Sequence, residues 1–108
     1  MFAALDSRYS SVIFMGVGLS TRLSETFRYV PPDVNPLHFL PHIQPPKLML
    51  HGLYDDGHPL STSEPIFQLM REPKKRGSYI GGHVPAPEIA VPLVNAFLDE
   101  TLAPVARK

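Results

Sequence analysis

Three short runs stand out in the hydrophobic pattern of the chain, and each ends at a glycine. They are residues 11–15 (SVIFM), residues 47–51 (KLMLH) and residues 77–80 (GSYI). Continuous apolar runs of this length, without strict alternation between apolar and polar positions, are typical of strands that are covered on both faces. The sequence therefore predicts three buried strands that belong to a parallel sheet.

Two further segments have apolar residues at the spacing of an amphipathic helix. In residues 61–70, the positions that would face a sheet are Ile66, Leu69 and Met70. In residues 87–102 the apolar stripe is longer and consists of Ile89, Leu93, Val94, Phe97, Leu98 and Leu102. Both patterns predict helices that pack against the sheet. Pro92 predicts either a kink in the second helix or a later start.

The first of these helices has two alternative start signals. Ser61 and Glu64 have the spacing of a capping box, and Ser63 followed by Pro65 in the first turn is an equally good start. Ahead of the second strand, residues 35–40 (NPLHFL) predict a short helix with Asn35 as the cap and proline at the first helical position.

The expected elements follow one another as strand, long connection, strand, helix, strand, helix. Strands separated by amphipathic helices are typical of the α/β class, in which a parallel sheet is covered on both faces. We expect a single domain over residues 1–108, with about three parallel strands flanked by helices. So narrow a sheet has exposed edges, which predict self-association or pairing with a partner chain.

Composition and charge exclude several classes of function. The 108 residues include ten basic and ten acidic side chains and no cysteine. A chain without an excess of Lys and Arg does not suit sequence-independent binding of nucleic acid. Without cysteine there is no disulfide, no thiolate metal site and no cysteine nucleophile. The single basic cluster, residues 74–76, is interpreted as a solvated turn before the third strand.

The sequence contains neither a membrane span nor a secretion signal. Its longest apolar stretch, residues 12–19, has eight residues, whereas a helix needs about 20 to cross a bilayer. The first ten residues lack the basic region and apolar core of a secretory signal. We therefore expect no membrane association and a cytoplasmic location.

Titratable side chains follow two of the predicted strands. Asp55 and Asp56 come after the second strand, and His83 comes after the third, 28 positions beyond Asp55. A right-handed crossover through one helix places the carboxyl ends of both strands at the same edge of the sheet, where ligands bind in open parallel sheets. A carboxylate and an imidazole brought together there are the components of a general base and the group that orients it.

These motifs resemble those of the α/β-hydrolase superfamily, over most of the chain. HGLYDDGHPL (residues 51–60) resembles its acid turn, in which a strand ends G-x-x-D with a proline four residues later. GGHVP (residues 81–85) resembles its histidine loop, and VPLVNAFLDETL (residues 91–102) its C-terminal helix. The segment that leads into the acid strand resembles dienelactone-hydrolase-like and acetyl-esterase-like members. The resemblance implies that Asp55 is the acid and His83 the base of a Ser-His-Asp triad; Asp56, one place past the matching position, is the alternative acid.

One part of the family pattern is missing. The nucleophile of the family precedes both partners on a G-x-S-x-G elbow, and the 108 residues contain no such motif. Ser20 lies near glycines but lacks the elbow spacing. The resemblance therefore implies the C-terminal part of a serine hydrolase acting on carboxylic esters, with the nucleophile elbow and the oxyanion-hole strands upstream. It also implies that residues 19–46 occupy the place where such folds carry substrate-binding or lid elements.

Two functional readings follow from this resemblance. In the first, the chain supplies the acid and the base, but not the nucleophile, of an enzyme whose partner is a small-molecule ester, with no cofactor. We expect the isolated chain to be inactive. In the second, the chain is a non-catalytic hydrolase-like module with a binding or regulatory role.

The remaining histidines have simpler interpretations. His51 is expected to pack inside the second strand, and His58 to face solvent in a turn, unless its position at the sheet edge brings it near substrate. His38 and His42 are four residues apart, but no glutamate stands between them as in HExxH. The group formed by His51, Asp55, Asp56 and His58 matches no metal motif. We predict no metal site.

Overall fold

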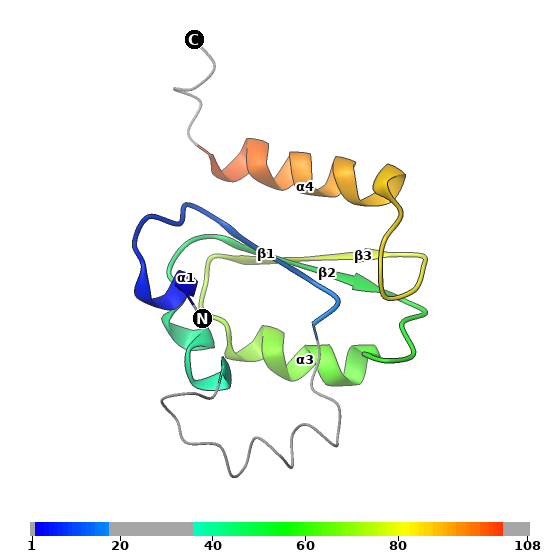
Figure 1. Cartoon of the computed structure of the whole chain (residues 1–108), viewed down its shortest axis with the longest axis horizontal. Coiled ribbons are helices and arrows are strands. Elements are labelled where there is room, and N and C mark those ends of the chain that lie inside the picture. Colours follow the sequence, from blue (N-terminus) through cyan, green and yellow to red (C-terminus); the bar gives the residue numbers. More distant parts are fainter. Residues whose placement is uncertain (1, 18–35, 103–108) are drawn as a thin grey trace.

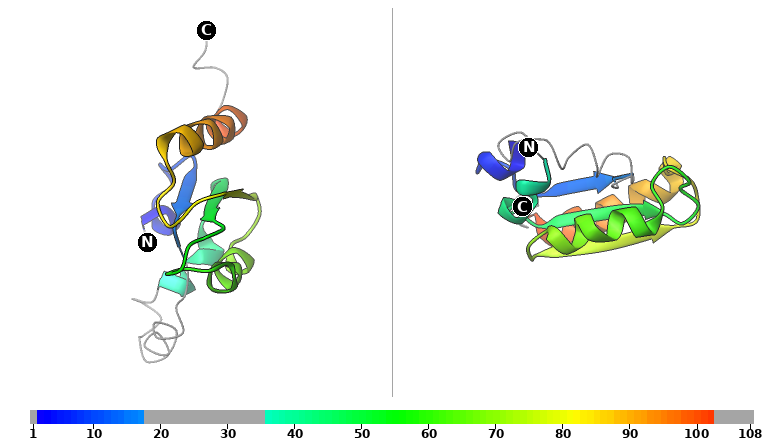
Figure 2. Two further views of the ribbon diagram at one scale, coloured as in Figure 1. Left: turned by 90° about the vertical axis from the view of Figure 1, so that its right-hand side faces the viewer. Right: turned by 90° about the horizontal axis from the view of Figure 1, so that it is seen from below.

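A three-stranded parallel sheet with helices on both faces forms the described part of the chain, residues 2–17 and 36–102 of a computed structural model (Figure 1). The elements are helix α1 (Phe2–Leu5), strand β1 (Val12–Met15), the 3-10 turns η2 (Pro36–His38) and η3 (Leu40–His42), strand β2 (Lys47–Gly52), helix α3 (Leu60–Leu69), strand β3 (Lys74–Tyr79) and helix α4 (Pro87–Thr101). Helices α4 and α3 lie on opposite sides of the sheet in Figure 1 and in both views of Figure 2. The predicted α/β class is confirmed.

Strand β2 is the centre of the sheet and is buried along its whole length. Starting at Lys47, it pairs in parallel with β1 on one side and with β3 on the other. The three strands run in the same direction, so their carboxyl ends meet at one edge of the sheet. Among the described residues, the order β1-β2-β3 leaves the outer edges of β1 and β3 without a partner strand. Self-association through these edges stays a prediction.

Alternate side chains of the sheet build two separate cores. The core on the α3 side consists of Leu40, Ile43, Met49, Ile66 and Met70. The core on the α4 side consists of Leu48, Leu50, Tyr79 and Phe97. The change of face between Leu48, Met49 and Leu50 follows from the two-residue period of a strand. A helix on each face explains why β2 has no polar alternation.

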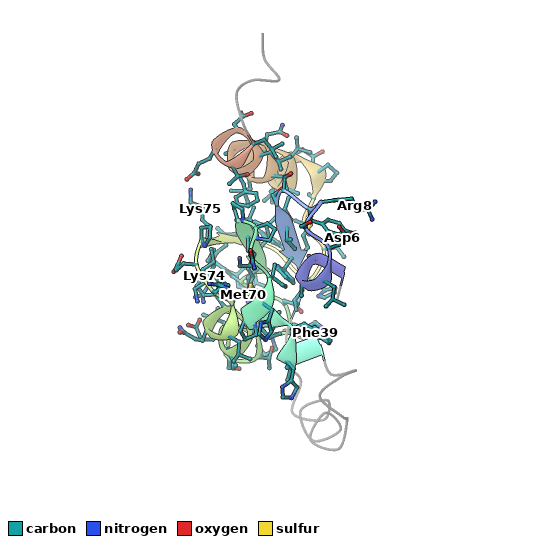
Figure 3. All side chains as sticks on the ribbon, turned by 90° about the vertical axis from the view of Figure 1, so that its left-hand side faces the viewer. Asp6, Arg8, Phe39, Met70, Lys74 and Lys75 are labelled. Atoms are coloured by element: carbon teal, nitrogen blue, oxygen red, sulfur yellow. The ribbon has the colours of Figure 1, made fainter. Side chains whose placement is uncertain are left out.

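The basic cluster at residues 74–76 is the beginning of strand β3, and its interpretation as a solvated turn was wrong. Figure 3 shows Lys74 on the α3 side of the sheet and Lys75 on the α4 side. The Lys74 ammonium lies 4.5 Å from the centroid of the Phe67 ring and donates to the Phe67 carbonyl. Lys75 pairs with Glu100 of α4. Long basic side chains can therefore occupy this strand because their stems cover the sheet while their charged ends reach partners on both helices.

Helix α3 begins at Leu60, two residues earlier than a cap at Ser61 predicts and four earlier than a cap at Ser63 predicts. Its cap is Pro59, with no side-chain hydrogen bond to the helix, so neither Ser61 nor Ser63 is the cap. The hydroxyls of Thr62 and Ser63 instead donate back to carbonyl oxygens at the start of the helix. Leu69 was expected to face the sheet but is 43% exposed, because the helix ends there.

Helix α4 begins at Pro87, so the alternative of a later start at Pro92 is wrong. Its apolar stripe packs on the sheet as predicted, except for Leu102, which lies beyond the last helical residue and is 44% exposed. The predicted short helix at residues 35–40 is replaced by η2 and η3, and its cap Asn35 lies outside the described residues. No helix within residues 2–17 and 36–102 has the length and apolar character needed to cross a membrane.

Lys47 at the start of β2 is a buried lysine, with 1% of its surface exposed. Its ammonium donates to the carbonyl oxygens of Ile43, at 2.7 Å, and Pro45, at 2.5 Å. Burial, together with the charges of Arg71 and Lys74, lowers the pKa of Lys47 against the opposing effect of Glu72. The side chain therefore ties the segment that enters β2 to the strand itself.

Candidate active site

The loops that follow β2 and β3 lie side by side at the carboxyl edge of the sheet, at the right of Figure 1. Asp55 is in the first loop and His83 in the second. The Nδ1 atom of His83 lies 2.8 Å from the Oδ2 atom of Asp55. The structure thus brings together the two residues that were expected to meet because their strands are parallel neighbours. Asp56, the alternative acid, is exposed.

The two partners differ sharply in exposure. The Asp55 side chain is 1% exposed and that of His83 is 51% exposed. The second oxygen of Asp55, Oδ1, accepts the backbone N–H of His58 at 2.8 Å. Both carboxylate oxygens therefore have donors, and the acid is held inside the fold while the imidazole reaches the surface.

This geometry is that of an oriented general base. An ionised carboxylate can only accept hydrogen bonds, so Nδ1 of His83 must carry the proton between them. When the imidazole is neutral, this tautomer leaves Nε2 of His83 unprotonated. Nε2 can then take a proton from a reacting group, and the carboxylate stabilises the imidazolium that forms.

The hydrogen bonds of Asp55 also determine its ionisation. Burial, the largest influence, opposes its charge, but the bonds from His83 and the His58 backbone, with the charges of both histidines, hold the pKa of Asp55 below its ordinary value. Because the pKa of Asp55 is depressed in the folded chain, its carboxylate stabilises the fold at pH values above about 3.9, the ordinary pKa of an aspartate. This contribution is lost as the pH falls below that value and through the folded-state pKa.

We expect Asp55→Asn to be less stable than the parent chain near neutral pH, with the difference shrinking on acidification below about pH 4. Urea unfolding of both proteins at a series of pH values measures this difference. Asp56→Asn is the matched control, because Asp56 is exposed, and its stability should track that of the parent chain. A stability difference for Asp55→Asn that stays constant down to low pH would contradict the role assigned to the hydrogen bonds of Asp55.

Two backbone hydrogen bonds join the first loop to the second, and the Tyr79 side chain holds the second loop against the end of β3. The N–H of Leu53 donates to the carbonyl of Tyr79 at 3.0 Å, and that of Tyr54 donates to Gly81 at 2.9 Å. The buried Tyr79 hydroxyl donates to the carbonyls of Gly82, at 2.8 Å, and His83, at 3.1 Å. Burial and the nearby Asp55 charge raise the pKa of Tyr79, which keeps its proton available for these bonds. Sequence reasoning missed Tyr79, because the carbonyls of Gly82 and His83 come within reach of the Tyr79 hydroxyl only when the loop has folded.

Gly16, directly after β1, lies against His83, the histidine that pairs with Asp55. Its φ is +63°, a left-handed conformation that favours glycine. A Cβ atom built on Gly16 would lie 2.6 Å from the Cε1 atom of His83 and 3.0 Å from both ring nitrogens. The third strand end of the sheet therefore also shapes the site, through the absence of a side chain.

His58 was expected to face solvent unless its position at the sheet edge brought it near substrate; it is partly buried and lies against the candidate base. The centroids of the His58 and His83 rings are 5.1 Å apart, with 36° between the ring planes. The expectation that His51 packs inside the second strand is confirmed, since this residue is buried in β2. His38 and His42 are both exposed. Ser20, the serine beside the glycines, lies outside the described residues.

A hollow of about 500 Å³ lies at the opposite end of the sheet, between α1, the turn after it and the segment before β2. Asp6, in its wall, pairs with Arg8, and Figure 3 shows these two side chains next to each other. His42 also lines the hollow, but no hydrogen bond or ion pair joins it to Asp6 in the described part of the chain. Within residues 2–17 and 36–102, no group of three or more His, Asp or Glu side chains could hold a metal ion.

Comparison with known proteins identifies the fold. No family model and no curated protein matches the sequence. A zinc-bound structure of a cold-adapted esterase from an Arctic intertidal metagenomic library matches with a TM-score of 0.69 and 20% identity, over 94% of this chain and 42% of that one. An esterase from Pyrococcus furiosus matches with a TM-score of 0.70 and 11% identity, over 94% and 48%. Acetyl xylan esterase 1 from Thermoanaerobacterium matches with a TM-score of 0.61 and 20% identity, over 94% and 41%.

The chain therefore shares its fold with part of each of these esterases, in agreement with the α/β architecture that its sequence predicts. It spans less than half the length of each of these esterases. At such low identity the likeness establishes the fold and leaves the chemistry of the site to be argued from its own residues.

Proposed function

We propose that this chain supplies the acid and the base of a serine hydrolase that cleaves carboxylic esters. The observation that carries this proposal is the 2.8 Å contact between the buried Asp55 carboxylate and the half-exposed His83 imidazole. It occurs at the carboxyl edge of a parallel sheet whose fold is shared with esterases. In this reading Asp55 orients His83, and Nε2 of His83 takes the proton of a serine hydroxyl.

The proposed reaction has two halves. The serine oxygen attacks the ester carbonyl as its proton passes to His83, and His83 then gives that proton to the departing alcohol, leaving an acyl-serine. In the second half, His83 takes a proton from water as the water oxygen attacks the acyl-serine carbonyl. The bond to the serine oxygen then breaks, which releases the carboxylic acid, and His83 returns the proton to the serine oxygen. Asp55 keeps its negative charge throughout and stabilises each imidazolium.

In this proposal the serine comes from residues that the 108-residue sequence does not contain. The absence of a G-x-S-x-G motif in the sequence supports this, as does the greater length of the matching esterases. The outer edge of β1 would be available for the strand that carries such an elbow.

Exposed apolar side chains surround the site and favour an ester with an apolar part. Leu53 and Tyr54 in the first loop are 54% and 69% exposed. Ile80 and Val84, on either side of His83 in the second loop, are 73% and 79% exposed. Exposed apolar residues on the two loops that carry the acid and the candidate base are suited to contact with an acyl or alcohol chain.

We expect the 108-residue chain alone to hydrolyse p-nitrophenyl esters no faster than free imidazole does. Loss of a triad nucleophile costs about a million-fold in turnover, and loss of an oxyanion-hole donor costs about another 2.7–4 kcal/mol of transition-state stabilisation. Steady-state assays of the parent chain and His83→Ala make this measurement. Substantial hydrolysis that His83→Ala abolishes would contradict the prediction and place a nucleophile within the chain.

A longer protein, which includes residues encoded ahead of Met1, provides the positive test. If the coding sequence ahead of Met1 encodes a strand followed by G-x-S-x-G, the protein that includes it should be labelled by a fluorophosphonate. Labelling should fail in its serine variant and in His83→Ala, and should persist in Asp56→Asn. A protein that includes this motif but is not labelled would favour the alternative, a binding or regulatory module with the hydrolase fold.

A further inference from the structure

We propose that His58 is a positioning residue for His83, acting through the face of its ring. The contact that this proposal describes exists in the chain as it stands, while its value for catalysis rests on the proposed function. The sequence offers no motif for such a role, since His58 stands between a glycine and a proline in what reads as a polar turn.

His83 needs support beyond its bond to Asp55. Half of the His83 side chain is exposed, and among residues 2–17 and 36–102 a single side-chain hydrogen bond, from Nδ1, ties the ring to the fold. This bond fixes the distance between the two groups, and Gly16 lies close to one part of the ring, but the half-exposed ring can still swing outward about the bond. The ring of His58, 5.1 Å away and tilted by 36°, lies within the range at which aromatic rings pack against each other. It can therefore limit that swing.

His58 is itself firmly placed. Its backbone N–H donates to Oδ1 of Asp55 at 2.8 Å. Its backbone is further restricted because the next residue is Pro59, which disfavours helical conformations of the residue before it. Pro59 is in turn the cap of α3. The same residue thus binds one oxygen of Asp55 with its backbone and packs with its ring against the imidazole held by the other oxygen.

No hydrogen bond joins the ring of His58 to the Asp55 carboxylate within the residues that the structure describes. Both oxygens of Asp55 already have donors, namely His83 and the His58 backbone. The Nδ1 atom of His58 is buried and has no hydrogen-bond partner in the part of the chain that the structure describes. What the side chain provides at this position is a flat surface against His83. A phenyl ring would provide the same surface without an unpaired buried polar atom.

This distinction defines the experiment, which uses two variants of the 108-residue chain. In ¹⁵N-labelled protein, the Nδ1–H proton of His83 is protected by its bond to Asp55 and should give a low-field NMR resonance, assigned by its loss in Asp55→Asn. We expect His58→Ala to lose this resonance through faster exchange with water. We expect His58→Phe to keep it. A nuclear Overhauser contact between the His58 and His83 rings is expected in the parent chain.

Three results would overturn the proposal. An unchanged resonance in His58→Ala would show that the ring does not position His83. Loss of the resonance in a folded His58→Phe, as complete as in His58→Ala, would show that the polar atoms of His58 are required. Absence of the nuclear Overhauser contact in the parent chain would show that the two rings do not pack against each other. That measurement does not depend on the folding of any variant. All these readouts are independent of hydrolysis, so a failure of the esterase proposal would leave them untouched.

Discussion

Gly52→Ala is expected to destabilise the chain by about 3 kcal/mol, at the upper end of the usual cost of overpacking a core. A Cβ atom at Gly52 would lie 2.1 Å from the carbonyl oxygen of Gly82 and 2.7 Å from that of Gly81. These atoms belong to backbone that cannot move cheaply, since the Tyr79 hydroxyl and the Tyr54 N–H bind the same two oxygens. Relieving the clash must therefore separate the loop that carries Asp55 from the loop that carries His83.

Urea unfolding, together with the low-field His83 resonance, tests this expectation. Gly82→Ala is the matched control, because a Cβ atom there meets nothing within 4 Å. It places a methyl group in the loop that Gly52 approaches, without a clash, and should change stability little. Equal stability of the two variants would show that the close approach at Gly52 does not hold the loops together.

Gly16→Ala is expected to damage the site more than the fold. A left-handed residue with a side chain costs about 1–2 kcal/mol, a cost that a stable domain survives. The new methyl group, however, would lie 2.6 Å from Cε1 of His83. Because the His83 side chain is half exposed, it can relieve this clash by moving outward, and in doing so it leaves Asp55.

The expected signature of Gly16→Ala is a folded protein without the low-field His83 resonance. In the longer protein considered above, fluorophosphonate labelling should fall together with that resonance. Gly57→Ala is the control within the acid loop, where a Cβ atom would lie 3.6 Å from Oδ1 of Asp55, an ordinary contact distance. A Gly16→Ala variant that keeps the resonance would show that His83 does not depend on the end of β1.

Both predictions concern glycines whose role sequence reasoning did not describe in this way. Gly52 was identified as the end of a strand and as part of the G-x-x-D spacing, and Gly16 only as the end of a strand. A glycine in a sequence shows that a side chain is absent. Which atoms occupy the space depends on how separate loops approach one another, and that is known only after the chain has folded.

The errors in secondary structure have a similar origin. The run at residues 74–76 looked like a turn because charged residues are usually solvated, yet Phe67 and Glu100 supply partners on the two helices that flank β3. Likewise, Ser61 and Ser63 have good capping chemistry, but α3 begins at Leu60. A serine cap stabilises a helix by only about 1 kcal/mol. The packing of the chain at the ends of its elements can outweigh so small a contribution.

The sequence by itself determined the α/β class, the three parallel strands, the two flanking helices and the meeting of Asp55 with His83. These follow from hydrophobic periodicity and from the rule that crossovers bring the ends of parallel strands to one edge. The tertiary structure alone decided what surrounds that pair: the bare surface of Gly16, the Tyr79 hydroxyl beneath the histidine loop and the ring of His58. Periodicity places a residue on a face or at an edge, whereas contacts of this kind depend on distances between segments far apart in the sequence, which only the folded chain determines.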